Sequence, residues 1–595
     1  MKRIFILFIT SALLSSCVEN TQRKEVQEDF TVVIHTSYEP NGLHPVNDFS
    51  SLRSHIYMYT HRPLLKVDLG SFELQPLLVT ELPQSEDGQR YLYTLRNDVT
   101  WGNGEKLTRE DVEFTLKMNL SPLSNNQAIR PLYSSVIQGF EAHPDNPNQF
   151  YLLCNEQHAG NNQILIEANL IQKSAWDSTG LFDGISLEQI IADEFERTEE
   201  INNYFGRFND ASNQYEPENL EGLGPYRIAE WERGQYITLE RKEDWWGDNE
   251  SGMYFDNNPS KIIFRIIKDD NATLLAFRNG DIDVSNRLGT DELLRLREKE
   301  EFNANFESDF VDQFAYSYMG LNCRPTAKER TPYFTDKLVR RALAHATPVR
   351  AIMEDLLHNQ GGAEQITMVS ALKEDQFNDT LDFIEYDLEK AATLLSEAGW
   401  TDSDGDGILD REIDGTSTAF SFELNYMSGN QTTEATCLMI KESLGKIGID
   451  CQLNGMDFSA FYQKAYQQDF DALMGAWSES AGYTDPLQLW HTSSWSSMGA
   501  NFCGFGNDYS DSLITTYNAT MNKPERDALI KELQAEVYDF QPYVFLYSTR
   551  RKVAIHKRFE NRETYNERPG VLVNSFRLDP NFTPTAPVSE ADTIE

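Results

Sequence analysis

The sequence predicts an α/β protein with more than one domain. Its 595 residues are too many for a single hydrophobic core, so two or three domains are expected. Stretches with strand-like alternation and stretches with helical spacing follow one another in both halves of the chain, which indicates the α/β class. A hydrophobic content of 40% and a charged content of 25% are ordinary for a folded globular protein.

The N-terminus has the features of a bacterial export signal. Lys2 and Arg3 precede an apolar run at 4–9, and small residues lie just before Cys17. The apolar run is too short for a membrane-spanning helix, and this order of features is typical of a secretory signal peptide.

The tetrapeptide Leu-Ser-Ser-Cys at 14–17 resembles the lipobox of bacterial lipoproteins. The resemblance implies that residues 1–16 are removed as a signal peptide and that Cys17 is lipidated, since several acyl chains give a stable anchor. The polar residues of 17–29 then form a lipidated tether. Val18 replaces the Asp that retains some lipoproteins in the inner membrane, which favours the outer membrane.

Charge and cysteine content exclude some classes of protein. The formal net charge of −42 repels phosphate backbones, so no nucleic-acid partner is expected. Without Cys17, an odd number of cysteines remains and none has CxxC spacing, so mostly buried thiols are expected. A bridge between the nearby Cys437 and Cys451 stays open. The five are Cys154, Cys323, Cys437, Cys451 and Cys503.

The N-terminal half begins with clear strand and helix signals. β-branched residues predict a strand at 31–35, and alternating apolar residues predict another at 91–95. Thr108 followed by Asp111 at the third helical position predicts a capped helix start.

The C-terminal half contains two amphipathic helices and one buried strand. Apolar residues at helical spacing predict helices at 388–398, where Gly399 supplies the stop, and at 525–540. The short apolar run at 472–477 predicts a buried strand, which ends where small and polar residues follow.

An ordered series of segments resembles the family 5 extracellular solute-binding proteins, the peptide- and nickel-binding receptors of ABC importers. The matches follow the family order from about residue 30 to 580. The usual threonine of the family's GTGPY segment is Leu223 here. The segments are YTLRNDVTWGNGEKLTREDVEFTLK ending at Lys117, GLGPYR at 222–227, FRIIKDDNATLLAFRNGDIDV at 264–284, Leu321-Asn322 with 334–343, 387–400, and 445–449.

The resemblance implies a two-lobed periplasmic-binding-protein (Venus-flytrap) fold that encloses its ligand between the lobes. Lobe I is expected from 30–285 and is completed by 548–590. Lobe II is expected from 286–547, and residues 69–221 should form the extra subdomain of the larger members. Such receptors close around a ligand by a hinge motion.

The expected function is that of a monomeric, lipid-anchored receptor in the periplasm. It would bind oligopeptides and deliver them to the permease and ATPase subunits of an ABC importer. A receptor for a non-peptide solute (an oligosaccharide, a metal chelate or an opine-like compound) is the first alternative. An extracytoplasmic hydrolase is a second, but the sequence has no HExxH, GxSxG or Walker A motif, and the SxxK at Ser370 lacks its SDN and KTG partners. No enzyme activity is expected.

The stretch 470–490 is the expected centre of the ligand site, because two acids and three aromatic residues follow its strand. Family resemblance implies that a peptide lies as an extra strand between 36–38 and 476–478, held by main-chain hydrogen bonds. The residues expected to bind the ligand are Tyr38, Asn322, Trp477, Glu479, Tyr483, Asp485 and Trp490.

One acid of this stretch is expected to pair with the α-amine of the peptide. Asp485 is predicted for this role, because the Asp-Pro pair of the family is intact here. Glu479 is the alternative, since the family's aspartate after the tryptophan is replaced by Glu479 and Ser480. A ligand without a free amine is the third possibility.

An aspartate-rich loop resembles a calcium-binding template. Its acids occupy positions 1, 3, 5 and 9, and a glycine occupies position 6, but Ile413 stands where a bidentate Glu is required. The alternatives are a structural Ca²⁺ and a solvated turn, and no other cofactor is expected. The candidate ligands are Asp402, Asp404, Asp406 and Asp410.

Overall fold

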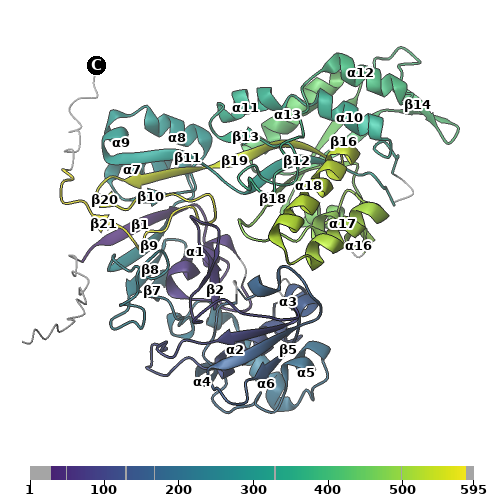
Figure 1. Cartoon of the computed structure of the whole chain (residues 1–595). Helices are drawn as coiled ribbons and strands as arrows, with labels where there is room; N and C mark the ends of the chain where they lie inside the picture. Colours follow the sequence, from purple (N-terminus) through teal and green to yellow (C-terminus); the bar gives the residue numbers. More distant parts are fainter. Residues whose placement is uncertain are drawn as a thin grey trace, which may run out of the picture.

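The computed structural model describes residues 29–48, 50–126, 130–165, 168–326, 330–496 and 499–583 (Figure 1). The predicted signal peptide, Cys17 and nearly all of the predicted tether lie outside these residues. Across the described residues, no helix combines the length and apolar character needed to cross a membrane.

A 12-stranded mixed sheet runs through most of the molecule, in the order β17-β16-β18-β12-β19-β10-β1-β9-β8-β7, and β11 and β13 also pair with β19. Its strands are β1 (Thr31–Thr36), β7 (Tyr226–Glu232), β8 (Tyr236–Arg241), β9 (Lys261–Ile266), β10 (Val284–Ser285), β11 (Phe306–Asp312), β12 (Ala315–Leu321), β13 (Gly362–Glu364), β16 (Ser421–Met427), β17 (Asp450–Met456), β18 (Ala472–Ser478) and β19 (Tyr543–His556).

The 14-residue β19 joins the two halves of this sheet, and Figure 1 shows it extending across both. Its first residues pair with β12, with Tyr543 opposite Gly320. Its last residues pair with β11, with His556 opposite Phe306. The backbone therefore passes between the halves twice, in the short β11–β12 connection and within β19.

The first half of the sheet is covered by α1 (Ser51–Thr60), whose start is capped by the Ser50 side chain. Leu52 and Ile56 of α1 are buried against the strands β1, β9 and β8. A smaller cluster packs residues of α7 (Asp270–Asn279), α8 (Thr290–Arg297), α9 (Glu300–Asn305) and β11 against Ala554 of β19.

This packing corrects one predicted boundary. Residues 286–312 were expected to open lobe II, but α8, α9 and β11 pack with the first half of the sheet. The boundary at 285/286 is therefore too early, and the chain crosses at the β11–β12 connection. The reason is that β10 and β11 both pair with the C-terminal part of β19, and the two short helices α8 and α9 connect them. The segment therefore stays with the first half of the sheet.

The extra subdomain is built on the three-stranded sheet β4-β6-β5 and lies at the bottom of Figure 1. Thr108 and Asp111 form the predicted capping box at the start of its helix α2. Its elements are β4 (Arg90–Thr94), β5 (Ile137–Ala142), β6 (Gln149–Cys154), α2 (Arg109–Leu120), α3 (Arg130–Val136), α4 (Lys173–Trp176), α5 (Leu187–Ala192) and α6 (Glu199–Phe208).

The second half of the sheet has an apolar core on each side. One core contains residues of α10 (Lys337–Ala346), α11 (Val349–Leu357), α12 (Leu388–Glu397) and α13 (Gln431–Gly445). The other contains residues of α14 (Phe458–Tyr466), α15 (Leu487–Trp490), α17 (Asp508–Ala519) and α18 (Lys523–Phe540).

The predicted elements are present with small shifts at their ends. The strands expected at 31–35, 91–95 and 472–477 are β1, β4 and β18. The helices expected at 388–398 and 525–540 are α12 and α18, and α18 starts two residues earlier after an Asn522 cap. The five described cysteines are free and buried, so the possible Cys437–Cys451 bridge is not formed.

Candidate ligand-binding site

A cavity of about 620 Å³ lies where the two halves of the sheet meet. That volume is within the range of small-molecule and peptide pockets. Its floor is the crossing itself, with Gln313 from the β11–β12 connection and 549–552 from β19. Gln313 joins the two crossing segments, because its amide donates to Thr549 Oγ1 at 2.6 Å.

The walls come from both halves of the molecule. One face of α1 supplies Ser51, Ser54, His55 and Met58, which follow helical spacing and so point the same way. The opposite wall is the end of β18, at 478–480. Lys66, the turn after β10 and the segment 567–569 close the remaining sides.

The cavity is strongly basic although the chain is strongly acidic. Six Lys or Arg side chains line it, against two carboxylates, Glu479 and Glu567. Arg550 is neutralised by Asp312, with Nε–Oδ1 at 2.6 Å. The six cations are Lys66, Arg287, Arg550, Arg551, Lys552 and Arg568.

Two of these cations are buried enough for their pKa values to change. Burial, together with the neighbouring charges of Arg287 and Arg568, lowers the pKa of Arg551 to about 10. Burial also lowers the pKa of Lys552 to about 8. Both shifts indicate that a low-dielectric environment penalises the positive charges in the absence of an anion.

Glu479 is the predicted binding residue that lines this cavity. Its Oε2 lies 3.2 Å from Nζ of Lys373, and the side chains are only 8% and 5% exposed. Burial raises the pKa of the Glu479 carboxyl, although Lys373 acts in the opposite direction. Its other oxygen, Oε1, is buried and has no hydrogen-bond partner among the described residues.

Lys373 is the lysine of the SxxK sequence, and its amine also donates to Thr484 Oγ1 at 2.9 Å. The ammonium of Lys373 binds both Glu479 and the loop after β18, so it stabilises the conformation of that loop.

Asp485 does not line the cavity, which argues against its predicted role as the amine partner. Its carboxylate accepts a hydrogen bond from Nδ2 of Asn518 at 2.8 Å and lies 3.6 Å from Nε2 of His158 in the extra subdomain. It also accepts from the backbone of Leu487 at the start of α15. The Asp485-Pro486 pair therefore marks the start of α15 and a contact with the extra subdomain.

The predicted aromatic walls have different surroundings. Trp490 is 2% exposed and packs against Phe505 and Tyr543, so it belongs to the core. Trp477 is half-buried and stacks near Phe502 at 6.3 Å between ring centroids. Tyr483 stacks on Tyr517.

Asn322 and Tyr38 also lie outside the cavity lining. The Asn322 amide is buried and donates to the carbonyls of Gln468 and Phe470, which fixes the turn before β18. The Tyr38 hydroxyl forms a hydrogen bond with Oγ of Ser51, which lines the cavity. The guanidinium carbon of Arg287 lies 5.4 Å from the centroid of the Tyr38 ring.

Sequence reasoning missed the arginine and lysine residues of the site. The run Arg550-Arg551-Lys552 was visible as a basic tripeptide in an acidic chain, and it gave a usable signal. Arg287 and Arg568 are single cations far apart in the sequence, and only the fold brings them to one cavity.

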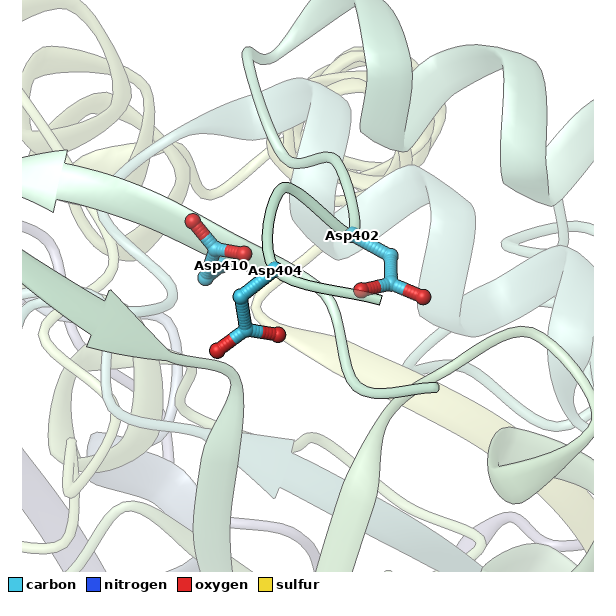
Figure 2. Close-up of side chains that lie close together, drawn as sticks. All are labelled: Asp402, Asp404 and Asp410. Carbon is cyan, nitrogen blue, oxygen red and sulfur yellow. The ribbon is translucent and has the colours of Figure 1, made fainter. Parts of the chain in front are cut away.

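The aspartate-rich loop does not line the cavity. It leads into β14 (Asp410–Ile413), which pairs with β15 (Thr416–Ala419). Carboxylate oxygens of Asp402, Asp404 and Asp410 lie within 4.8 Å of one another, and Figure 2 shows these three side chains. Asp406 is outside this group, and its Oδ1 accepts from the backbone of Ile408. The three oxygens fit a hard cation, but the fourth predicted ligand does not join them.

Known proteins resemble this chain over nearly its whole length. It is 27% identical over 581 residues to the oligopeptide-binding protein AppA of Bacillus subtilis, with 95% of each chain covered. The structure of that protein in complex with a nonapeptide covers 93% of this chain and 100% of its own, with 24% identity and a TM-score of 0.69. The structure of NikA from Brucella suis in complex with Fe(III)-EDTA gives a TM-score of 0.73 at 18% identity, covering 93% and 100%.

Both solved structures share the α/β fold of periplasmic binding proteins with this chain. The family model described as bacterial extracellular solute-binding proteins, family 5 Middle, matches residues 73–499, which is more than half of the sequence. The proteins that this chain resembles are binding proteins rather than enzymes. This chain therefore belongs to the family 5 bacterial extracellular solute-binding proteins.

Proposed function

We propose that this protein is a lipid-anchored receptor that binds oligopeptides in the cavity between its lobes and delivers them to an ABC importer. The lobes would close by rotation about the β11–β12 connection and β19. Lipidation of Cys17, an outer-membrane location and the partnership with permease and ATPase subunits are parts of this proposal.

The observation that carries the peptide proposal is the free edge at the end of β18. β16 pairs with β18 only at Ala472 and Leu473. Residues 474–478 pair with β12 on one side, and on the other side no described strand pairs with them. This edge runs into the cavity at Ser478. Its unpaired N–H and C=O groups could hold a peptide as an added strand without reading its side chains.

A charged partner for the peptide α-amine is also present in the cavity. Glu479 follows this edge directly, and its Oε1 has no hydrogen-bond partner within the described part of the chain. An ammonium group placed there would satisfy a buried acceptor that is otherwise costly. The Bacillus subtilis relative is an oligopeptide-binding protein, which agrees with this ligand class.

A receptor for a non-peptide anion, such as a metal chelate, is the second candidate. The specific observation in its favour is the excess of cations in the cavity. The Brucella suis structure of the same fold contains Fe(III)-EDTA, which is itself an anionic chelate.

Native mass spectrometry of freshly purified protein separates the two candidates. The peptide proposal expects a co-purified mixture of short peptides that is released on denaturation. A single non-peptide mass, or a metal-containing one, would contradict it and favour the chelate. Intact mass of the detergent-extracted protein tests the anchor in the same preparation, because lipidation adds the mass of the acyl chains to a chain that starts at Cys17.

A further inference from the structure

The cavity has an excess of positive charge that the proposed peptide-binding function alone does not require. Six cations and two carboxylates line it, and one of the cations, Arg550, is paired with Asp312. The whole chain has a formal net charge of −42, so the basic lining contrasts with the rest of the molecule. A concentrated charge of one sign in a cleft attracts ligands of the opposite sign.

Four of the six cations have no carboxylate ion-pair partner among the described residues: Arg287, Arg551, Lys552 and Arg568. The Lys552 amine also lacks a hydrogen-bond partner within the same part of the chain. Burying a charge without a counter-charge costs free energy, so an internal partner would be expected if these side chains had only a structural role.

The guanidinium groups are instead oriented by neutral acceptors. Arg551 is 8% exposed, and it donates to the carbonyl of Tyr565 at 2.9 Å and to Oε1 of Gln313 at 3.2 Å. Arg568 donates to Oγ of Ser478, at the end of the free β18 edge. Neutral acceptors hold the two guanidinium groups in place without an ion pair, so the groups can still bind a ligand carboxylate.

The two carboxylates of the cavity do not cancel this charge. Glu479 is paired with Lys373, which lies outside the cavity lining. Glu567 accepts from the backbone N–H groups of Ala481 at 2.6 Å and Arg568 at 3.0 Å. Glu567 partly offsets the charge of Arg551, but Arg287 and Arg568 act on Arg551 in the opposite direction.

We propose that the cavity selects anionic oligopeptides, whose carboxylates bind Arg287, Arg551, Lys552 and Arg568. This inference rests on the proposed peptide-binding function and adds the charge class of the ligand. A neutral peptide would leave several of these cations without a partner, and a lysine-rich peptide would add repulsion.

The test is a titration of the full mature protein with three hexapeptides of equal length, based on Ala with two Glu, two Gln or two Lys. The Glu peptide is expected to bind at least about tenfold more tightly than the Gln peptide, a difference of about 1.4 kcal/mol. The Lys peptide is expected to bind more weakly still. The preference should shrink as salt is added, because screening weakens charge attraction.

Lys552→Met and Arg287→Gln are the informative variants, since neither side chain forms an ion pair that the fold depends on. Each is expected to reduce the ratio of the affinities for the Glu and Gln peptides by about threefold or more. Arg197→Gln is the matched control, because Arg197 is an exposed residue of the extra subdomain, paired with Asp193. That variant should retain the full preference.

The outcomes separate this inference from the proposed function. Equal affinity for the Glu and Gln peptides would overturn the inference and leave the peptide receptor intact. If no peptide binds, the proposed function fails. The inference about anionic oligopeptides then fails with it, and binding of citrate that Lys552→Met weakens would instead favour the receptor for a non-peptide anion.

Discussion

The two acids that follow β18 have different surroundings, although both are near Trp477 in the sequence. Glu479 faces the cavity and keeps one buried oxygen without a partner in the described structure. The Asp485 carboxylate accepts a hydrogen bond from Asn518 and lies close to His158, where the extra subdomain contacts the second half of the molecule. The structure therefore moves the expected amine partner from Asp485 to Glu479, and this assignment remains a prediction.

Glu479→Gln should weaken binding of a peptide with a free α-amine by about tenfold or more, because a charge-assisted hydrogen bond contributes about 1.5–3 kcal/mol. An N-acetylated peptide of the same sequence should be unaffected. Calorimetric titration of both peptides measures the difference. Asp485→Asn is the matched control, and a weakened affinity in that variant alone would return the role to Asp485.

Lys552 should make the affinity for an acidic peptide depend on pH. Its pKa is lowered to about 8, so the free protein loses this positive charge as the pH rises through 8. The pKa values of His55, about 3, and Arg551, about 10, keep their charge states constant from about pH 7 to 9. The affinity should therefore fall over this range.

The Lys552→Met variant provides the control for this prediction. It should bind an N-acetylated acidic peptide, which has no α-amine to lose its charge at about pH 8, with the same affinity at both ends of the range. A bound anion raises the pKa of the lysine, so the fall in the wild type should begin near the pKa of the free protein and level off near the higher pKa of the complex. A pH profile that is identical in the two proteins would contradict the assignment.

At the scale of elements, the loop between α12 and β14 brings three carboxylates close enough together to bind one cation. Within the described residues it is the one such group (Figure 2). Asp402 already accepts hydrogen bonds from the backbone of Gly405 and Gly407, so the loop has an internal scaffold. The calcium site stays a prediction, and three of its four aspartates lie together.

Calcium at about 1 mM should raise the Tm of EDTA-treated protein if this loop binds it, because a ligand that binds only the folded state stabilises that state. Asp404→Asn should abolish the increase, and Asp379→Asn, at an exposed position elsewhere, should not. A Tm that is unchanged by calcium in the wild type would leave the loop as a solvated turn.

At the scale of the whole molecule, the extra subdomain contacts α17 and the loop after β18, which pack on the second half of the sheet. The backbone N–H of Ala159 donates to the carbonyl of Asn518 at 2.7 Å, and Gly160 lies against the ring of Tyr483. A Cβ at Gly160 would lie 2.9 Å from that ring, so only glycine allows this close approach. These contacts should form when the lobes close.

Gly160→Val should therefore hinder closure and weaken peptide binding without a large loss of stability. Small-angle X-ray scattering should show a decrease in radius of gyration when peptide is added to the wild type, and a smaller decrease in the variant. Gly184→Val is the matched control, since a Cβ there meets nothing within 4 Å. Equal compaction of both variants would contradict a role for this contact in closure.

Local patterns were sufficient to predict the elements that form the fold. The capping box at Thr108, the helical spacing up to Gly399 and the apolar run of β18 are properties of short segments, and the structure confirms them. The ordered family motifs also predicted the α/β binding-protein fold, which the comparisons confirm. They could not predict side-chain surroundings, as Trp490 shows: its position near the acids suggested a pocket wall, but it packs in the core.

The sequence by itself determined the class of protein, because periodicity, capping residues and motif order are written along the chain. Only the tertiary structure decided the chemistry of the cavity. Arg287, Arg551 and Arg568 come from three distant segments, and their shared position depends on how β10, β19 and the C-terminal segment pack. Whether a charge is paired or unpaired depends on distances in space. The physical reason is that Coulomb attraction and burial act through space and not along the sequence.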